Sequence, residues 1–368
     1  FPSKKVVICS NYAWTIWNFR MPLIKSLRES GYEVFVLTQF DGYEKKIKSA
    51  SVHVCNLFIS RKGINPLLDV LTFFHISYWL IRIRPYSILC FTIKPVIYGA
   101  LAARLSRVRS IVTITGLGTA FLSDNWITKV VSGLYKVALS SVSAVFFQNK
   151  DDVRLFTGLK LVRPNLCRLS PGSGIDLDRF AYAELKKAKV FTFLLVARLL
   201  WDKGVGEYVE AARCVRKVVP NVRVQLLGPL GVQNRSAIDE HVVLGWVQDG
   251  IVEYLGEVED IQDCVRRATC VVLPSYREGT SRVLLEAASI GRPILTTDVP
   301  GCREVVKDGV NGFLCRSRDP ADLADKMMKT MSLSHEELVQ AGRAGREIVE
   351  DEFSQNIVGK LYMDALKS

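Results

Sequence analysis

The residues best suited to chemistry lie in one short stretch of the chain. Two glutamates, Glu278 and Glu286, stand eight positions apart around the small-residue turn Gly279-Thr280-Ser281. An apolar run at 270–274 precedes the turn, and a helix-forming run follows it. A strand, a small-residue turn and a helix start together form a site for an anion, and the two carboxylates can accept hydrogen bonds from hydroxyl groups around it. A ligand with phosphate in its middle and hydroxyls at both ends is a nucleotide sugar.

A cationic pair follows an earlier strand of the same half of the chain. Arg198 and Lys203 lie in the loop between an apolar run at 190–197 and a helix-forming run at 204–218. A guanidinium forms a planar fork against phosphate oxygens, and an ammonium acts as a point charge. We expect both to face a diphosphate. The simpler alternatives are an ordinary basic loop for this pair and exposed surface positions for the two glutamates.

Short apolar runs alternate with helix-forming runs in two successive series, which predicts an α/β protein with two doubly wound, Rossmann-like domains facing across a cleft. The predicted domains are 1–172 and 173–350. A helix in 351–368 would cross back to the first domain. Strands are expected at 4–10, 33–38, 88–92, 110–115, 144–148, 190–197, 222–227, 252–255, 270–274 and 293–297, and helices at 18–30, 204–218, 259–268, 281–290 and 320–332.

Charge and composition bear on which ligands and surfaces the protein can bind. The formal net charge is +12, and residues 1–172 carry 23 basic and 8 acidic residues, so the excess lies entirely in the first half. A solvated basic face explains this most simply, but an anionic membrane surface also fits, and the pattern contains no nucleic-acid-binding motif. The longest apolar segment, 67–83, is expected to be a buried helix. Nine scattered cysteines and four isolated histidines predict buried thiols in a reducing cytosol, with no metal site.

An ordered set of motifs resembles the retaining glycosyltransferases of family 4, which have the GT-B fold. The first half is similar to the subgroup that builds bacterial surface polysaccharides, such as O-antigen and other lipopolysaccharide components, on a lipid carrier. The matching pieces are Arg198, Lys203-Gly204, Gly228, Gly256, Pro274-Ser275, Glu278-x7-Glu286, Gly291-x-Pro293, Gly301 and Asn311-Gly312, with Asn18-Phe19-Arg20, Thr92-Ile93-Lys94-Pro95, Gly116-Leu117-Gly118, Gly172-Ser173-Gly174-Ile175-Asp176 and Pro300-Gly301-Cys302-Arg303-Glu304.

The resemblance implies a role for each matching donor-side position. Glu286 would hold the ribose hydroxyls. Glu278 and the backbone of Gly279, Thr280 and Ser281 would hold the transferred sugar. Arg198 and Lys203 would neutralise the diphosphate, and the backbone around Gly228, Gly256 and Val258 would contact the base. No cofactor is implied beyond the nucleotide-sugar co-substrate, for which UDP is favoured.

The resemblance implies that the domain 1–172 binds the acceptor and that the domain 173–350 binds the donor. On the acceptor side, it implies Asn18, Arg20, Lys94, Gly116 and Gly118 as binding residues, with Arg104 as a further cation for a polyprenyl diphosphate. Many family members carry a histidine after the strand that here ends in Thr115, and this chain has a glycine turn instead. Two other motifs suggest different chemistry: Asp176 and Asp178 resemble a D-x-D metal site, and the glycine turn superficially resembles a dinucleotide site that lacks its third glycine.

The expected activity is therefore metal-independent, retaining transfer of a hexose or N-acetylhexosamine to a polyprenyl-diphosphate-linked sugar. The enzyme would act in the cytoplasm, at the inner face of the cell membrane. Transfer to a small water-soluble acceptor and nucleotide-sugar binding without catalysis are the alternatives.

Overall fold

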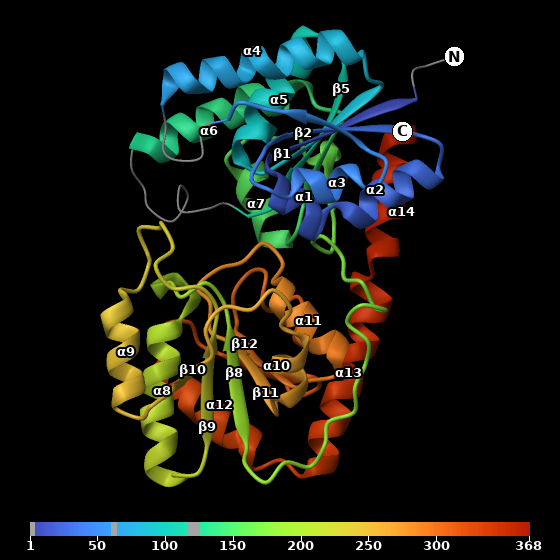
Figure 1. Ribbon diagram of the computed structural model, residues 1–368. Helices are drawn as coiled ribbons and strands as arrows, with labels where there is room; N and C mark the ends of the chain where they lie inside the picture. The colour runs from blue at the N-terminus through green and yellow to red at the C-terminus, as the bar shows by residue number, and fades with distance from the viewer. Residues whose placement is uncertain (1–3, 60–64, 117–125) are drawn as a thin grey trace. The chain divides into compact units, whose positions relative to one another are not determined.

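The computed structural model describes residues 4–59, 65–116 and 126–368, which form two compact units (Figure 1). Unit 1 comprises residues up to Gly174 together with Gln355–Ser368, and unit 2 comprises Ile175–Ser354. The chain therefore passes between the units twice, after Gly174 and after Ser354, whereas the sequence divided it after 172 and 350.

Unit 1 is built on a parallel sheet of seven strands in the order β3-β2-β1-β4-β5-β6-β7. The strand order reverses between β1 and β4, and ligands bind outside the carboxyl ends of the strands at such a point. The strands are β1 (Lys5–Tyr12), β2 (Glu33–Gln39), β3 (His53–Asn56), β4 (Ser87–Phe91), β5 (Arg109–Ile114), β6 (Ala144–Phe147) and β7 (Cys167–Leu169). The helices are α1 (Ala13–Phe19), α2 (Met21–Glu29), α3 (Glu44–Lys48), α4 (Pro66–Ile83), α5 (Ile93–Leu105), α6 (Trp126–Ala138), α7 (Lys150–Gly158) and α14 (Gln355–Lys367).

Unit 2 repeats this plan with six parallel strands in the order β10-β9-β8-β11-β12-β13, and the order reverses between β8 and β11. The strands are β8 (Thr192–Val196), β9 (Arg223–Leu227), β10 (Glu253–Tyr254), β11 (Cys270–Leu273), β12 (Ile294–Thr297) and β13 (Gly312–Cys315). The helices are α8 (Val205–Val218), α9 (Glu240–Gln248), α10 (Gln262–Arg267), α11 (Arg282–Ile290), α12 (Pro320–Met331) and α13 (His335–Phe353). The loops carrying Lys203 and Glu278 follow the adjacent strands β8 and β11.

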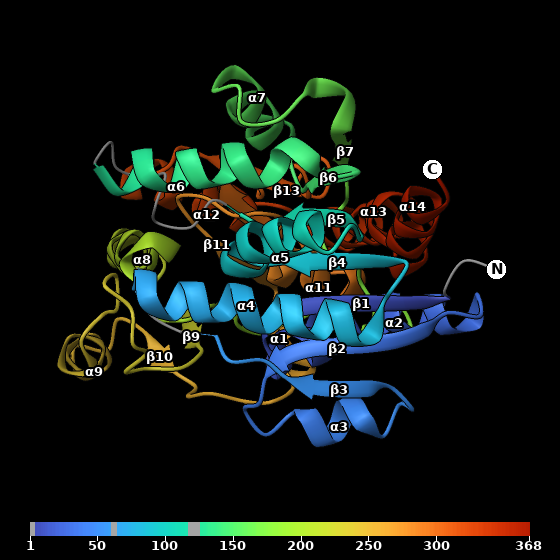
Figure 2. The same ribbon diagram turned by 90° about the horizontal axis from the view of Figure 1, so that it is seen from above.

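Three helices of unit 1 run side by side over one face of its sheet (Figure 2): α5 packs against both α4 and α6. The residues of α4 that face the sheet are buried, but a stripe on its other side is exposed. The segment 67–83 is helical as expected, but it is buried on one side only. Within the described residues, α4 is also the one helix that has the length and mean hydropathy needed to cross a membrane.

The helix expected at 18–30 is α2, and a separate helix, α1, precedes it. α1 ends at Phe19, Arg20 leaves helical geometry with φ −125° and ψ −6°, and α2 begins with Pro22 in its first turn. Proline has no backbone N–H and its ring clashes with the preceding turn, so a continuous helix is disfavoured there. Gly31, with φ +83°, follows the end of α2 as expected.

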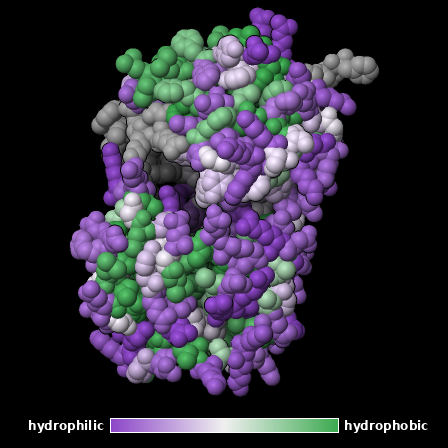
Figure 3. Space-filling view, in the orientation of Figure 1, coloured by the Kyte–Doolittle hydropathy of each residue, from purple (hydrophilic) through white to green (hydrophobic). Residues whose placement is uncertain are grey.

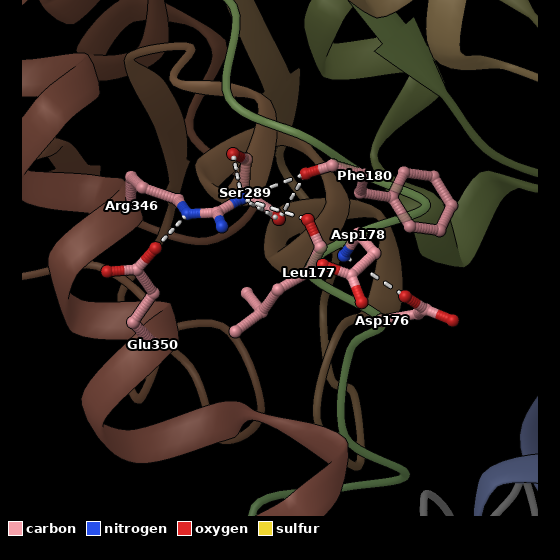
Figure 4. Close-up of polar contacts among 7 residues, drawn as sticks. All are labelled: Asp176, Leu177, Asp178, Phe180, Ser289, Arg346 and Glu350. Atoms are coloured by element: carbon pink, nitrogen blue, oxygen red, sulfur yellow. Dashed lines mark hydrogen bonds and ion pairs between the residues drawn. The ribbon is translucent and has the colours of Figure 1, made fainter.

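In unit 2, Arg346 of α13 links the first residues of the unit, near Phe180, to the end of α11 (Figure 4). Its Nη1 lies 3.0 Å from the carbonyl oxygen of Phe180 and 3.1 Å from that of Ser289, and its Nε contacts Glu350 at 2.5 Å. The Ser289 hydroxyl also donates to the Phe180 carbonyl at 2.6 Å. These bonds hold α11, which carries Glu286, at its C-terminal end.

Candidate active site

A partly buried ion pair joins the two loops at the switch point of unit 2. Lys203 closes a 3₁₀ turn (Trp201–Lys203) after β8, and its Nζ lies 2.5 Å from the Glu278 Oε1. Both side chains are 17% exposed, so each charge needs a partner at this depth. Each residue is the partner of the other. The pair places one cation in the loop after β8 and one carboxylate in the loop after β11.

Backbone and side-chain bonds hold these two loops together. The Asp202 carbonyl accepts the Tyr276 N–H at 3.0 Å, and the Tyr276 hydroxyl donates to Glu207 at 2.5 Å. Burial and the neighbouring Glu207 carboxylate raise the pKa of Tyr276, so this hydroxyl keeps its proton. The sequence did not single out Asp202, Glu207 or Tyr276, because their partners lie about 70 positions away along the chain.

A third loop supports the turn between β11 and α11. The Pro300 carbonyl accepts the Glu278 N–H at 3.0 Å, and the Gly301 carbonyl accepts the Ser281 N–H at 2.9 Å. A Cβ on Gly301 would lie 2.4 Å from the Glu278 backbone. The Ser281 N–H therefore already has a partner, although it was expected to face the ligand together with Gly279 and Thr280. All three residues lie on the turn that leads into α11.

Glu286 lies in the second turn of α11 and is 7% exposed. Its Oε1 accepts a hydrogen bond from the Arg282 Nε at 2.7 Å. Burial raises the pKa of Glu286, and the Arg282 guanidinium opposes that rise. The i,i+4 spacing of this pair was visible in the sequence, but only the structure shows that the pair is nearly buried.

The two glycines expected to contact the base meet at the carboxyl ends of β9 and β10. The Gly228 N–H donates to the Gly256 carbonyl at 2.8 Å, and the Tyr254 hydroxyl donates to the Gly228 carbonyl at 2.9 Å. Val258 follows on the same loop and is exposed. Arg198 comes directly after β8 and its side chain is exposed, so it can turn toward a ligand without breaking an ion pair among the described residues.

The acceptor-side cations are already engaged within unit 1. The Arg20 guanidinium is buried over the Phe91 ring, 4.0 Å from its centroid. Lys94, in the first turn of α5, contacts Asp69 of α4 at 2.7 Å. Arg104 lies ten residues further along α5, about 15 Å away at 1.5 Å per residue, so it cannot share one diphosphate with Lys94.

The other three positions expected to bind the acceptor are Asn18, Gly116 and Gly118. The Asn18 amide donates to the Trp14 carbonyl one turn earlier, at 2.9 Å. Gly116 follows β5 with φ +136°, a conformation that favours glycine. Gly118 lies outside the described residues.

The D-x-D motif of Asp176 and Asp178 caps a turn of the chain. The Asp176 carboxylate accepts the N–H group of Asp178 at 3.1 Å (Figure 4). It also accepts the N–H group of Arg179 at 3.0 Å. Within the described ranges no three His, Cys, Asp or Glu residues cluster as metal ligands. All nine cysteines are free and five are buried, but Cys214 is exposed, so the expectation of buried thiols holds only in part.

We expect Gly204→Ala to destabilise the loop that carries Lys203. Gly204 has φ +71°, and an added Cβ would lie 2.0 Å from the Pro274 carbonyl oxygen. Gly250→Ala is a matched control, because Gly250 has φ +68° but open space around its Cβ position. Overpacking costs about 1–3 kcal/mol beyond the backbone effect that both variants share, so thermal unfolding should show a larger loss of stability for Gly204→Ala. Equal losses would contradict the close approach.

Comparisons with known proteins agree with this arrangement. The family model "Glycosyl transferases group 1" matches residues 190–332, and "Glycosyl transferase 4-like" matches residues 5–149. The N,N'-diacetylbacillosaminyl-diphospho-undecaprenol alpha-1,3-N-acetylgalactosaminyltransferase of Campylobacter jejuni is 27% identical over 98% of this chain and 97% of its own length. The capsular polysaccharide biosynthesis glycosyltransferase CapM of Staphylococcus aureus is 24% identical over 91% of this chain and 90% of its own length.

Solved structures share the fold. The crystal structure of Anabaena HepE in complex with UDP has a TM-score of 0.79 at 17% identity, and the alignment covers 99% of both chains. A glycosyltransferase structure from Rickettsia africae also has a TM-score of 0.79, at 15% identity, with 100% of this chain and 98% of that chain covered. With matched models in both halves and full-length relatives, the chain belongs to the family 4 glycosyltransferases of the GT-B fold, in the group that contains enzymes of bacterial surface-polysaccharide assembly.

Proposed function

We propose that this enzyme transfers a hexose or N-acetylhexosamine from a UDP-sugar to a saccharide carried on a polyprenyl diphosphate. The assignment of the donor is supported by the Lys203–Glu278 pair at the switch point of unit 2. It is also supported by the buried Glu286, which lies eight residues after Glu278 on α11. The acceptor half is supported by the Campylobacter jejuni relative, whose name specifies a diphospho-undecaprenol-linked acceptor and which aligns along nearly its whole length.

In this proposal the donor displaces the internal ion pair. The Lys203 ammonium turns to the diphosphate, and the Glu278 carboxylate accepts hydroxyls of the transferred sugar. Arg198 adds a second cation, and Glu286 accepts the two ribose hydroxyls. Cations placed at the diphosphate stabilise the negative charge that the leaving group gains in the transition state.

The proposed reaction retains configuration and needs no metal ion. The bond between the anomeric carbon and the diphosphate oxygen breaks while the acceptor oxygen attacks from the same face. The acceptor proton passes to an oxygen of the departing diphosphate, so no side chain is required as a strong base. The role of the protein is to hold the donor and the acceptor in position and to stabilise charge.

The deciding experiment is a panel of radiolabelled nucleotide sugars tested with a short-chain polyprenyl-diphosphate saccharide and with the same saccharide free in water. Transfer from one UDP-sugar to the lipid-linked acceptor alone is the expected result. Transfer to the free saccharide at an equal kcat/KM would instead favour a water-soluble acceptor. Donor binding without transfer to either acceptor would contradict the proposed acceptor class.

We further propose that the enzyme works at the cytoplasmic face of the membrane and is attracted by anionic lipid. The first 172 residues carry 23 basic and 8 acidic residues, and each cation near an anionic surface contributes about 1 kcal/mol. Vesicles with 30% phosphatidylglycerol should therefore bind the protein, and binding should weaken steeply between 0.05 and 0.5 M NaCl as the Debye length shortens from about 14 to about 4 Å. Binding that is independent of salt would contradict an electrostatic attraction.

A further inference from the structure

Helix α4 of unit 1 exposes an apolar stripe along its length. The stripe recurs at the three- and four-residue spacing of one helix face and consists of Leu67, Val70, Leu71, Phe74, Tyr78 and Ile81. Leu67 is 78% exposed and Phe74 60%, which are large fractions for such side chains. In the space-filling view, hydrophobic residues gather at the top of unit 1, where α4 runs in Figure 1 (Figure 3). Exposed contiguous apolar surface on this scale marks a site of interaction.

The opposite face of α4 is the more polar one, and its contacts fix the orientation of the helix. Asp69 is buried and binds Lys94 of α5 at 2.7 Å. Thr72 and Ser77 are also buried, and their hydroxyls donate to the carbonyls one turn earlier at 2.9 Å. A surface helix ordinarily turns its polar side outward. Here the polar side packs against α5, so the apolar side cannot rotate inward without breaking a buried ion pair.

Positive charge surrounds the stripe. Asp69 is the only acidic residue in the sequences of α4, α5 and α6, and it is buried. Exposed cations lie at the C-terminal ends of α4 and α5 and along α6. On α6, each of the two lysines is followed by an exposed valine. These residues are Arg82, Arg84, Arg104, Arg107, Lys129 and Lys136, with Val130 and Val137 on α6. The apolar stripe thus lies within a cationic face of the three helices.

We propose that this face docks on an anionic lipid bilayer, with α4 lying in the plane of the interface and its stripe inserted among the acyl chains. An interfacial helix combines an apolar face with cations that meet anionic headgroups. The packing of α4 on α5 favours this over a membrane-spanning orientation, although the helix has the length to cross. A second copy of the chain is disfavoured as the occupant because two cationic faces repel each other.

The proposal deepens the proposed function, and rests on it, because it assigns a route to the lipid-linked acceptor. α4 and α5 begin at the same edge of the unit 1 sheet, where Asp69 binds Lys94. The N-terminal part of the stripe, with Leu67 and Leu71, therefore lies at the edge where β4 ends and α5 begins. A polyprenyl chain that stays in the bilayer would present its diphosphate at this edge.

The test compares Phe74→Gln/Tyr78→Gln/Ile81→Gln, which changes the part of the stripe away from the acceptor edge, with a control, Val218→Gln/Leu244→Gln, which changes exposed apolar residues of unit 2. Both are measured by co-sedimentation with phosphatidylcholine vesicles containing 30% phosphatidylglycerol. The α4 variant should bind at least about tenfold more weakly, since interfacial binding scales with the apolar area inserted, while the control binds as wild type. All substituted side chains are exposed, and circular dichroism with thermal unfolding would verify that both variants fold.

Transfer measured in detergent micelles separates this inference from the proposed function. Retained transfer in micelles with lost vesicle binding would support both. No transfer by the wild-type enzyme in micelles would contradict the proposed function, and weakened vesicle binding of the variant would still support the docking face. Unchanged vesicle binding by the α4 variant would overturn the inference. So would sedimentation velocity that shows a wild-type dimer dissociated by the α4 substitutions.

Discussion

Lys203→Ala is expected to lower kcat by about 10²–10³-fold, because removing one preorganised stabiliser of transition-state charge typically costs about 2.7–4 kcal/mol. The Lys203 Nζ lies in the loop after β8, 2.5 Å from the Glu278 carboxylate. Steady-state kinetics with the UDP-sugar identified by the donor panel would measure the loss. Lys203→Arg should recover part of the rate, since it keeps the charge but not its position.

The control for this variant is a second Lys–Glu pair of unit 2. Lys307 contacts Glu352 at 2.9 Å, but both side chains are about half exposed, so Lys307→Ala should change neither kcat nor KM. Calorimetry adds a discriminating readout: Lys203→Ala should weaken binding of UDP and leave binding of uridine unchanged. Equal weakening of both ligands would place the lysine away from the diphosphate.

The same variant should also lose stability, for a reason that can be separated from catalysis. Removing Lys203 leaves the Glu278 carboxylate without its cation at a site only 17% exposed, and an unpaired charge at such depth is costly. Lys203→Ala/Glu278→Gln removes that charge and should regain most of the lost Tm. It should not regain kcat, because the diphosphate still lacks its cation.

The parallel strands were predictable because they are buried on both faces and form short apolar runs. β8 and β11, for example, are wholly buried. The strands that were missed are the edge strands β3, β7 and β13, which are four residues long or shorter. β3 and β7 have little buried surface to produce a pattern. β13 is mostly buried, but its four residues are too few to establish a period.

The convergence of Lys203 and Glu278 was predictable because sheet topology places the loops after β8 and β11 side by side. On the acceptor side, the partner of Lys94 is Asp69, 25 residues away on an otherwise apolar helix. No local pattern reveals that pairing. The exposed face of α4 was hidden because the packed side also carries large apolar residues, Ile76, Leu80 and Ile83, beside its polar ones. The sequence therefore does not show which side of the helix is packed.

Glu286→Ala is expected to raise the donor KM and to lower kcat/KM by about 10–150-fold, since hydrogen bonds to a charged group contribute about 1.5–3 kcal/mol. The carboxylate is buried on α11 and, in the proposed complex, accepts both ribose hydroxyls. Binding of uridine should therefore weaken as much as binding of UDP, which is the opposite of the pattern expected for Lys203→Ala. Glu29→Ala is a control, because Glu29 of unit 1 also pairs with a cation, Lys25, at i,i+4 spacing but is exposed.

The pH dependence gives this prediction a second, independent readout. Burial raises the pKa of Glu286 above the ordinary glutamate value of 4.5. As pH falls, the carboxyl group takes up its proton earlier than an exposed glutamate and loses the capacity to accept two hydroxyl hydrogens at once. The donor KM should therefore rise with falling pH, beginning above the range where ordinary glutamates titrate. Glu286→Gln cannot titrate, so its donor KM should lack this rise; a rise that persists in Glu286→Gln would assign the titration to another group.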